Sequence, residues 1–188
     1  MTASPSRIQM PVGARKRGFT LAELMAVVVI VGILATLASV GYSKYILAAK
    51  SSEAVYMVNG IRAAEESYRA ETLSYLNVSG SLDAYYPHAS PGAFKTQWGG
   101  GSGQVADRWR VLSVTSDGPV YYGYAVIAGG PGDVVAPGLY SGFDSDLPVA
   151  TEPWYIVQAM GNLNGDSIPS YYVASSFSNQ GSWINEGE

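Results

Sequence analysis

The stretch RKRGFTLAELMAVVVIVGILATLASV, residues 15–40, places three cations, a glycine and a phenylalanine before a long apolar run. One carboxylate, Glu23, lies near the start of that run. From Leu24 to Ser43 the chain then has 20 residues without a charge. As an α-helix this segment is roughly 30 Å long, which matches the hydrocarbon thickness of a bilayer. The pattern predicts a membrane-spanning helix that carries an acid at its entry.

The charges around the apolar run predict its orientation and leave two simpler explanations open. Because the cations Arg15, Lys16 and Arg17 precede the run, the N-terminal side is expected to stay in the cytoplasm. A secretory signal peptide has the same order of charges, and ATLASV (35–40) offers small residues for its cleavage. A plain single-span anchor is the second alternative. Neither explains Glu23, because a charge inside the membrane costs about 2.5 to 3.5 kcal/mol.

The junction RGFTLAELM (17–25) resembles the class III leader junction of type IV pilins and of the related type II secretion pseudopilins. The resemblance extends over roughly residues 15–70. It implies that a prepilin peptidase cuts between Gly18 and Phe19 and then methylates the new N-terminus at Phe19. It also implies that Glu23 pairs with the N-terminal amine of a neighbouring subunit. Since a buried charge is tolerable when it is paired, this acid would fix the register of the filament.

The residues after Ser43 keep a helical period and become amphipathic. The apolar ones recur at spacings of three, four or seven and form one stripe: Leu47, Ala54, Val58, Ile61, Ala64 and Tyr68. The charged ones occupy the other face: Lys50, Glu53, Arg62, Glu66 and Arg69. Two pairs four residues apart, Arg62 with Glu66 and Glu65 with Arg69, have the spacing of ion pairs within a helix. A single helix from about Phe19 to about Thr72 is predicted.

The rest of the chain predicts a long loop and then a sheet. Turn-forming residues dominate residues 73–107, and a connector of this length often carries function. Four runs rich in aromatic and β-branched residues predict strands: residues 108–114, 120–128, 153–160 and 170–177. Short connections between them predict an antiparallel sheet with the helix packed across one face. The expected fold class is therefore α+β, with a head like that of pilins.

These assignments divide the chain into five segments. They are a cleaved leader (1–18), a transmembrane and assembly helix (19–43), the amphipathic half of the helix (44–72), a variable surface loop (73–107) and the antiparallel sheet head (108–188). The pilin resemblance implies that the loop lies on the filament surface and that the leader is removed before assembly.

The composition argues against several classes of function. The chain has no cysteine, which excludes disulfides, thiolate metal sites and cysteine nucleophiles. One histidine, and no clustered carboxylates beyond Asp144 and Asp146 in a loop, argue against an enzyme. Removal of residues 1–18 takes away four of the 11 basic residues, which leaves 7 basic against 15 acidic residues and a charge of −8. Direct binding of nucleic acid is therefore not expected.

The turn GNLNGDSIP (161–169) contains a candidate metal site. Asn162, Asn164 and Asp166 alternate oxygen-bearing side chains, as the opening of a calcium loop does. However, Gly165 comes one place early, and no acid closes the loop at the expected distance. An Asn-Gly hairpin turn explains the pattern better. No cofactor is predicted, and calcium stays a weak alternative.

The resemblance implies a structural subunit, a major or minor pilin, of a type IV pilus-like filament that serves motility, adhesion or uptake. The implied partners are the same or other pilins, the prepilin peptidase, the inner-membrane assembly machinery and, before assembly, membrane lipid. The implied location is the bacterial inner membrane, with the C-terminus outside the cytoplasm, and then an extracellular pilus or a periplasmic pseudopilus. Two alternatives stay open: a type II secretion pseudopilin, and a single-span anchored binding or sensor module that does not polymerise.

Overall fold

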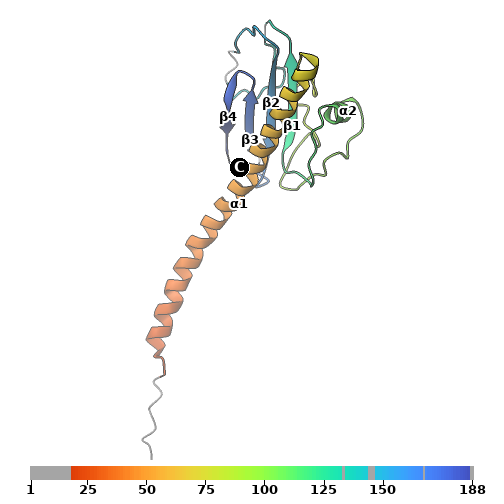
Figure 1. The fold of residues 1–188 in the computed structure, drawn as a ribbon. Helices are drawn as coiled ribbons and strands as arrows, with labels where there is room; N and C mark the ends of the chain where they lie inside the picture. The colour runs from red at the N-terminus through yellow and green to blue at the C-terminus, as the bar shows by residue number, and fades with distance from the viewer. Residues whose placement is uncertain (1–17, 133, 144–146, 167, 187–188) are drawn as a thin grey trace, which may run out of the picture. The chain divides into compact units, whose positions relative to one another are not determined.

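The computed structural model describes residues 18–132, 134–143, 147–166 and 168–186 (Figure 1). It divides into two compact units, one that ends at Gly41 and one that begins at Tyr42. The predicted leader lies outside the described residues, except for Gly18. Asp144 and Asp146 lie outside them as well.

Helix α1, Leu21–Thr72, contributes residues to both units. It is helical through both glycines of the apolar run, Gly32 and Gly41. The helix ends because Leu73 adopts a left-handed φ of 63°, and the Leu73 N–H donates to the Arg69 carbonyl at 2.8 Å. The predicted single long helix is therefore present.

The second unit contains a four-stranded antiparallel sheet in the order β1-β2-β3-β4. The strands are β1 Gly123–Gly129, β2 Trp154–Gly161, β3 Ser170–Ser175 and β4 Ser178–Ile184. The part of α1 that belongs to this unit crosses one face of the sheet (Figure 1). The fold is the pilin-like α+β arrangement expected from the sequence.

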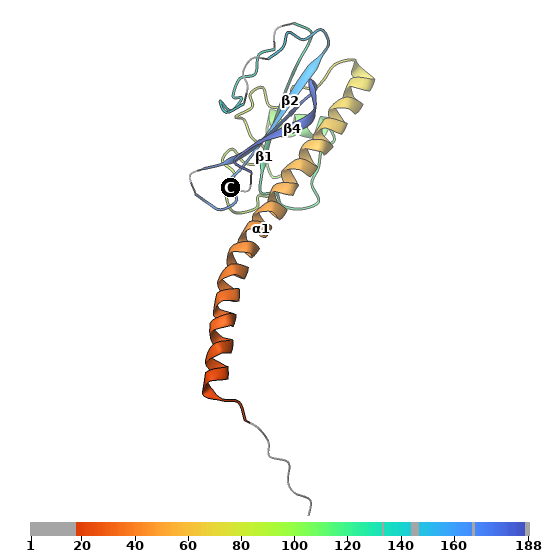
Figure 2. The ribbon, with the colours of Figure 1, turned by 90° about the vertical axis from the view of Figure 1, so that its left-hand side faces the viewer.

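Alternate strand residues enter two cores on opposite faces of the sheet. The core on the α1 side joins Ala54, Val58 and Ile61 of α1 to Tyr124, Val126, Tyr155, Val157 and Ala159. The core on the other side joins Ala125, Ile127, Trp154 and Ile156 to Leu82 and Ala150 of the loops. Figure 2 shows α1 and the long β1–β2 connection on opposite sides of the sheet. Because both faces are covered, β1 and β2 are almost continuously apolar in sequence.

The stripe predicted on α1 is confirmed: Ala54, Val58 and Ile61 are fully buried, and Leu47, Ala64 and Tyr68 pack at the edge of the same core. The strands predicted at 120–128, 153–160 and 170–177 are confirmed as β1, β2 and β3.

The strand predicted at 108–114 is wrong. Residues Gln104–Val111 form a second helix, α2. Ala106, Trp109 and Leu112 are buried at a spacing of three, which is a helical spacing. The apparent alternation in RWRVLSV arose because the window began in the middle of this helix.

Strand β4 was not predicted. It lies at the edge of the sheet, and its sequence SNQGSWI is mostly exposed and polar. A strand of this kind lacks the apolar alternation on which recognition from sequence depends.

Gln158 on β2 connects the sheet to the loops that cover its outer face. Its side chain is fully buried. The side-chain oxygen accepts the Tyr140 N–H at 3.0 Å. The side-chain nitrogen lies 2.7 Å from the Tyr85 hydroxyl and 3.1 Å from the carbonyls of both Leu82 and Gly138. One amide therefore holds two separate loop segments against the strand.

We expect Gln158→Leu to lower the free energy of unfolding by about 2 to 4 kcal/mol, because a buried polar group without a partner costs about 1 to 3 kcal/mol. Urea unfolding in detergent, followed by tryptophan fluorescence, measures this loss. All four tryptophans lie between residues 98 and 183, so the signal reports the second unit. The exposed Gln97→Leu is the matched control, with a change within about 0.5 kcal/mol. Equal losses in the two variants would contradict the role given to the amide.

Candidate processing and assembly site

The predicted cleavage bond lies in an exposed segment before α1. Gly18, Phe19 and Thr20 have no regular secondary structure, and Phe19 is 83% exposed. A Cβ atom placed on Gly18 would meet no heavy atom within 4 Å. The described chain therefore sets no steric requirement for glycine here. The bond is in the kind of accessible, non-helical segment that peptidases bind.

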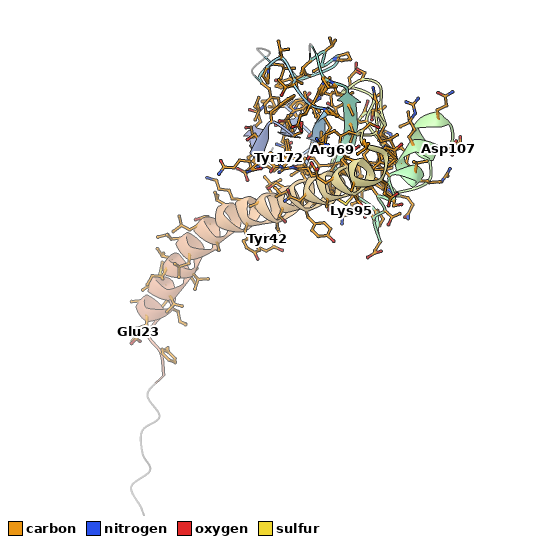
Figure 3. The ribbon with its side chains drawn as sticks, turned by 45° about the horizontal axis from the view of Figure 1, so that its top comes forward. Glu23, Tyr42, Arg69, Lys95, Asp107 and Tyr172 are labelled. Atoms are coloured by element: carbon orange, nitrogen blue, oxygen red, sulfur yellow. The ribbon has the colours of Figure 1, made fainter. Side chains whose placement is uncertain are left out.

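Glu23 forms a capping box with Thr20 at the start of α1 (Figure 3). The Glu23 Oε2 atom accepts the Thr20 N–H at 2.9 Å and the Thr20 hydroxyl at 2.8 Å. In return the Thr20 hydroxyl oxygen accepts the Glu23 N–H at 3.2 Å. This reciprocal pattern satisfies two N–H groups that the first turn of a helix leaves without partners. The acid predicted to serve assembly thus also begins the helix.

The capping role was missed at the sequence level, although the signal was present. Thr-Leu-Ala-Glu, residues 20–23, is the spacing of a capping box directly before an apolar run.

The apolar run of α1 has no cover within the described residues. α1 is the described helix that is long and apolar enough to cross a membrane, with a mean hydropathy of 2.6 in its best window. None of that window is buried, and its large apolar side chains are 55% to 74% exposed. Such a surface requires lipid or other chains around it.

Comparison with known proteins agrees with this arrangement. Residues 13–39 match the family described as the prokaryotic N-terminal methylation motif. Through this motif and the helix that follows it, the chain is similar to type IV pilins. It is 38% identical over 68 residues to the type IV major pilin protein PilA of Myxococcus xanthus, which covers 36% of this chain and 31% of the relative. No solved structure gives a significant match.

Two further pilin relatives show the same extent of similarity. The type IV major pilin protein PilE1 of Neisseria gonorrhoeae is 45% identical over 53 residues, 28% of this chain and 32% of the relative. A fimbrial protein of Moraxella nonliquefaciens is 43% identical over 54 residues, 29% of this chain and 35% of the relative. The matches thus cover about a third of these pilins, and the chain is a type IV pilin-like subunit with a distant relationship to them.

The candidate metal residues of this pilin-like chain lie together in the β2–β3 turn, where their oxygens bind the turn itself. Asn162 Oδ1 accepts the Gly165 N–H at 2.8 Å, and Asn164 Oδ1 accepts the Asp166 N–H at 3.1 Å. Asp166 Oδ1 accepts the Ile168 N–H at 2.6 Å. Gly165 has a left-handed φ of 79°, as a turn with Asn-Gly chemistry requires. The part of the chain that the structure describes has no group of three His, Asp or Glu side chains able to hold a metal.

The charged face of α1 binds the head rather than itself. Arg62 donates to the carbonyls of Ser178 and Asn179, both at 3.1 Å, and Arg69 forms an ion pair with Glu152 at 2.6 Å. The predicted pairs Arg62–Glu66 and Glu65–Arg69 are absent from the ion pairs of the described residues. They were wrong because the head offers these side chains partners that a helix taken alone does not have.

Glu65 is a buried acid on the face of α1 that packs on the head. Its side chain is fully buried, and Oε2 accepts the Leu76 N–H at 2.9 Å. Oε1 has no hydrogen-bond partner among the described residues. Burial raises the pKa of Glu65 from its ordinary value of 4.5 to about 7; the Leu76 bond opposes this shift, and the neighbouring Glu66 adds to it. From the sequence, Glu65 was expected to pair with Arg69, and nothing indicated its burial.

We expect this burial to make the stability of the second unit depend on pH. Between about pH 4.5 and pH 7 the acid loses its proton in the unfolded chain and keeps it in the folded chain. The free energy of unfolding should therefore fall by about 3 kcal/mol as the pH rises through this window, and stay level above it. Urea unfolding at a series of pH values tests this.

Glu65→Gln should remove most of that fall, because an amide oxygen can still accept the Leu76 N–H without carrying a charge. Glu71→Gln, at an exposed position of the same helix, should keep it. A pH profile shared by all three proteins would show that Glu65 is not its source.

Proposed function

We propose that this chain is a subunit of a type IV pilus-like filament, cleaved between Gly18 and Phe19, methylated at Phe19 and assembled through the apolar part of α1. One observation carries the proposal: an uncovered apolar helix begins at a capped acid, directly after an accessible Gly-Phe bond. Its partners would be copies of itself or other pilins, a prepilin peptidase and inner-membrane assembly machinery. The role is structural and not enzymatic.

The geometry of Glu23 supports a second role besides capping. Both bonds from Thr20 reach Oε2, so the carboxylate keeps Oε1 as an acceptor toward another chain. Cleavage at Gly18 creates a cationic amine on Phe19. Pairing of that amine with Glu23 of a neighbouring copy would neutralise both charges inside the bundle of helices. A subunit one step out of place would leave both unpaired, which costs about 3 to 5 kcal/mol.

The proposed path runs from membrane to filament. The subunit first lies in the inner membrane with its C-terminus outside the cytoplasm, and then joins a surface pilus. A periplasmic pseudopilus of a type II secretion system is the alternative end point. It is separated from a surface pilus by whether mechanical shearing of cells releases the protein.

Processing is tested by mass spectrometry of the chain recovered from membranes. We expect the N-terminus to be methylated Phe19, with residues 1–18 removed. Gly18→Val should block cleavage and leave the fold intact, because a side chain at Gly18 meets nothing. Gly32→Ala, at another glycine whose Cβ would meet nothing, should be processed normally. Wild-type membranes that contain only chains with residues 1–18 attached would overturn the proposal.

Assembly is tested by separating the charge of Glu23 from its capping role. Glutamine can serve in a capping box, so Glu23→Gln removes the charge and keeps the cap. We expect Glu23→Gln and Glu23→Ala both to lower the yield of sheared filaments by well over tenfold relative to the membrane pool, because each leaves the buried amine unpaired.

Thr20→Ala is the matched control, since it removes the hydroxyl cap and keeps the charge, at a cost of about 1 kcal/mol. It should still form filaments. If Glu23→Gln assembles as well as the wild type, then the charge is dispensable, and an anchored module that does not polymerise becomes the better explanation.

A further inference from the structure

The arginines and the lysines that follow Gly18 differ in their partners. The four arginines are bound within the second unit: Arg62 to Ser178 and Asn179, Arg69 to Glu152, Arg108 to the Asn77 carbonyl and Arg110 to Asp107. The three lysines are Lys44, Lys50 and Lys95. Lys44 has no ion-pair partner among the described residues, and the other two converge on one aromatic ring.

That ring belongs to Tyr121. The Nζ atoms of Lys50 and Lys95 lie 4.8 Å and 4.9 Å from its centroid. Glu53 connects the two segments, because its Oε1 accepts the Tyr121 N–H at 2.7 Å and its Oε2 lies 4.0 Å from Lys95 Nζ. The tertiary structure therefore brings a lysine that is 45 residues later in the chain to the level of Lys50 on α1. Figure 3 labels Lys95 beside α1.

The carboxylates near the two lysines have other partners as well, and Glu53 lies at the outer limit of an ion pair with Lys95, at 4.0 Å. Glu53 is only 20% exposed and is bound to the start of the β1 segment, whereas Lys95 is 46% exposed. Lys50 also donates to the Leu163 carbonyl at 3.3 Å, next to the turn that contains Asp166. The Asp166 carboxylate is bound by that turn itself. Lys95, exposed and paired only at 4.0 Å, thus stays available to an anion from outside, and Lys50 adds a second positive charge on the same ring.

Exposed aromatic side chains flank these cations. Tyr42 and Tyr45, on either side of Lys44, are 68% and 70% exposed, and Phe94, next to Lys95, is 87% exposed. Tyrosine is enriched where membrane meets water, and lysine can extend its ammonium from apolar surroundings into the headgroup layer. The combination is typical of a surface that lies on a membrane.

The position along the chain fits the headgroup layer. Lys44 is the first charge after the 20 uncharged residues, and Lys50 is six residues further, or about 9 Å along a helix. The headgroup region adds about 5 to 8 Å to each side of the hydrocarbon core. If the uncharged residues span the core, the backbone of Lys50 lies close to the outer edge of the headgroup layer, and a flexible lysine side chain can bridge the remaining distance to the lipid phosphates.

We propose that Lys44, Lys50 and Lys95, with Tyr42, Tyr45 and Phe94, form a surface that binds anionic phospholipid headgroups and holds the unassembled second unit against the membrane. This inference rests on the membrane stage of the proposed function. Lipid is favoured over nucleic acid because the chain without its leader carries a charge of −8, which opposes a long polyanion. A headgroup needs only this local group of cations.

The absence of native cysteine allows a single reporter to be placed cleanly. Gln97→Cys, at an exposed position near Lys95, is labelled with a fluorophore in the full chain. The protein is reconstituted into vesicles that carry a quencher on their headgroups, made of phosphatidylcholine with or without phosphatidylglycerol. We expect stronger quenching with phosphatidylglycerol, and loss of the difference in about 1 M salt, where the screening length is about 3 Å.

Variants assign the effect to the lysines. Each lysine near an anionic surface contributes about 1 kcal/mol, or about fivefold in the association constant, so Lys50→Gln with Lys95→Gln should lower that constant about 25-fold. Lys50→Arg with Lys95→Arg should preserve it, which separates charge from packing. Arg110→Gln is the matched control, since it removes a cation on α2 that pairs with Asp107.

Flotation with the vesicles separates the two levels of the proposal. A chain that does not float with either vesicle would defeat the membrane stage and this inference together. A chain that floats with both, and whose quenching is the same in both or unchanged by the double glutamine variant, would overturn the headgroup surface alone. The proposed filament function would then stand.

Discussion

The central constraint on this protein is a stretch of helix surface that nothing in the described chain covers. From Leu24 to Ser43, α1 has no charge, and its apolar side chains are mostly exposed. The second unit completes its own core without them. Such a surface is stable only in lipid or among similar helices. A single chemical feature thus accounts for both the membrane stage and the filament stage that we propose, because the same surface would exchange lipid for neighbouring helices.

Glu23 lies at the start of α1, and its geometry allows two roles, capping of the helix and pairing with another chain. Its capping box with Thr20 gives hydrogen-bond partners to two backbone N–H groups at the start of the helix. These bonds matter more in lipid than in water, because lipid offers no hydrogen-bond partners. As a carboxylate it would offer a charge to a neighbouring copy in the proposed filament. The capping role belongs to the single chain, and the pairing role exists only in an assembly. Substitution by alanine alone would confuse the two.

In the second unit, charged residues of α1 serve as tethers instead of a solvated face. Arg62 binds the start of β4, Arg69 binds Glu152, and Glu53 binds the backbone just before β1. Glu65 is fully buried, in contrast to these three residues, and its burial raises its pKa. The arginines suit this role through several donors in a fixed fork. The lysines carry one compact charge each, and two of them, Lys50 and Lys95, lie over the Tyr121 ring.

The sequence by itself determined the long helix, its apolar and amphipathic halves, three of the strands and the similarity to pilins. Each depends on a local pattern: an uncharged run, a helical stripe, aromatic and β-branched runs, and a junction motif. Only the tertiary structure decided the helix at Gln104–Val111 and the polar edge strand Ser178–Ile184. It also decided the partners of the α1 charges and the approach of both Lys50 and Lys95 to the Tyr121 ring. These depend on contacts between residues far apart in the chain. Burial and partner choice there are set by what packs opposite, and no local window of sequence contains that information.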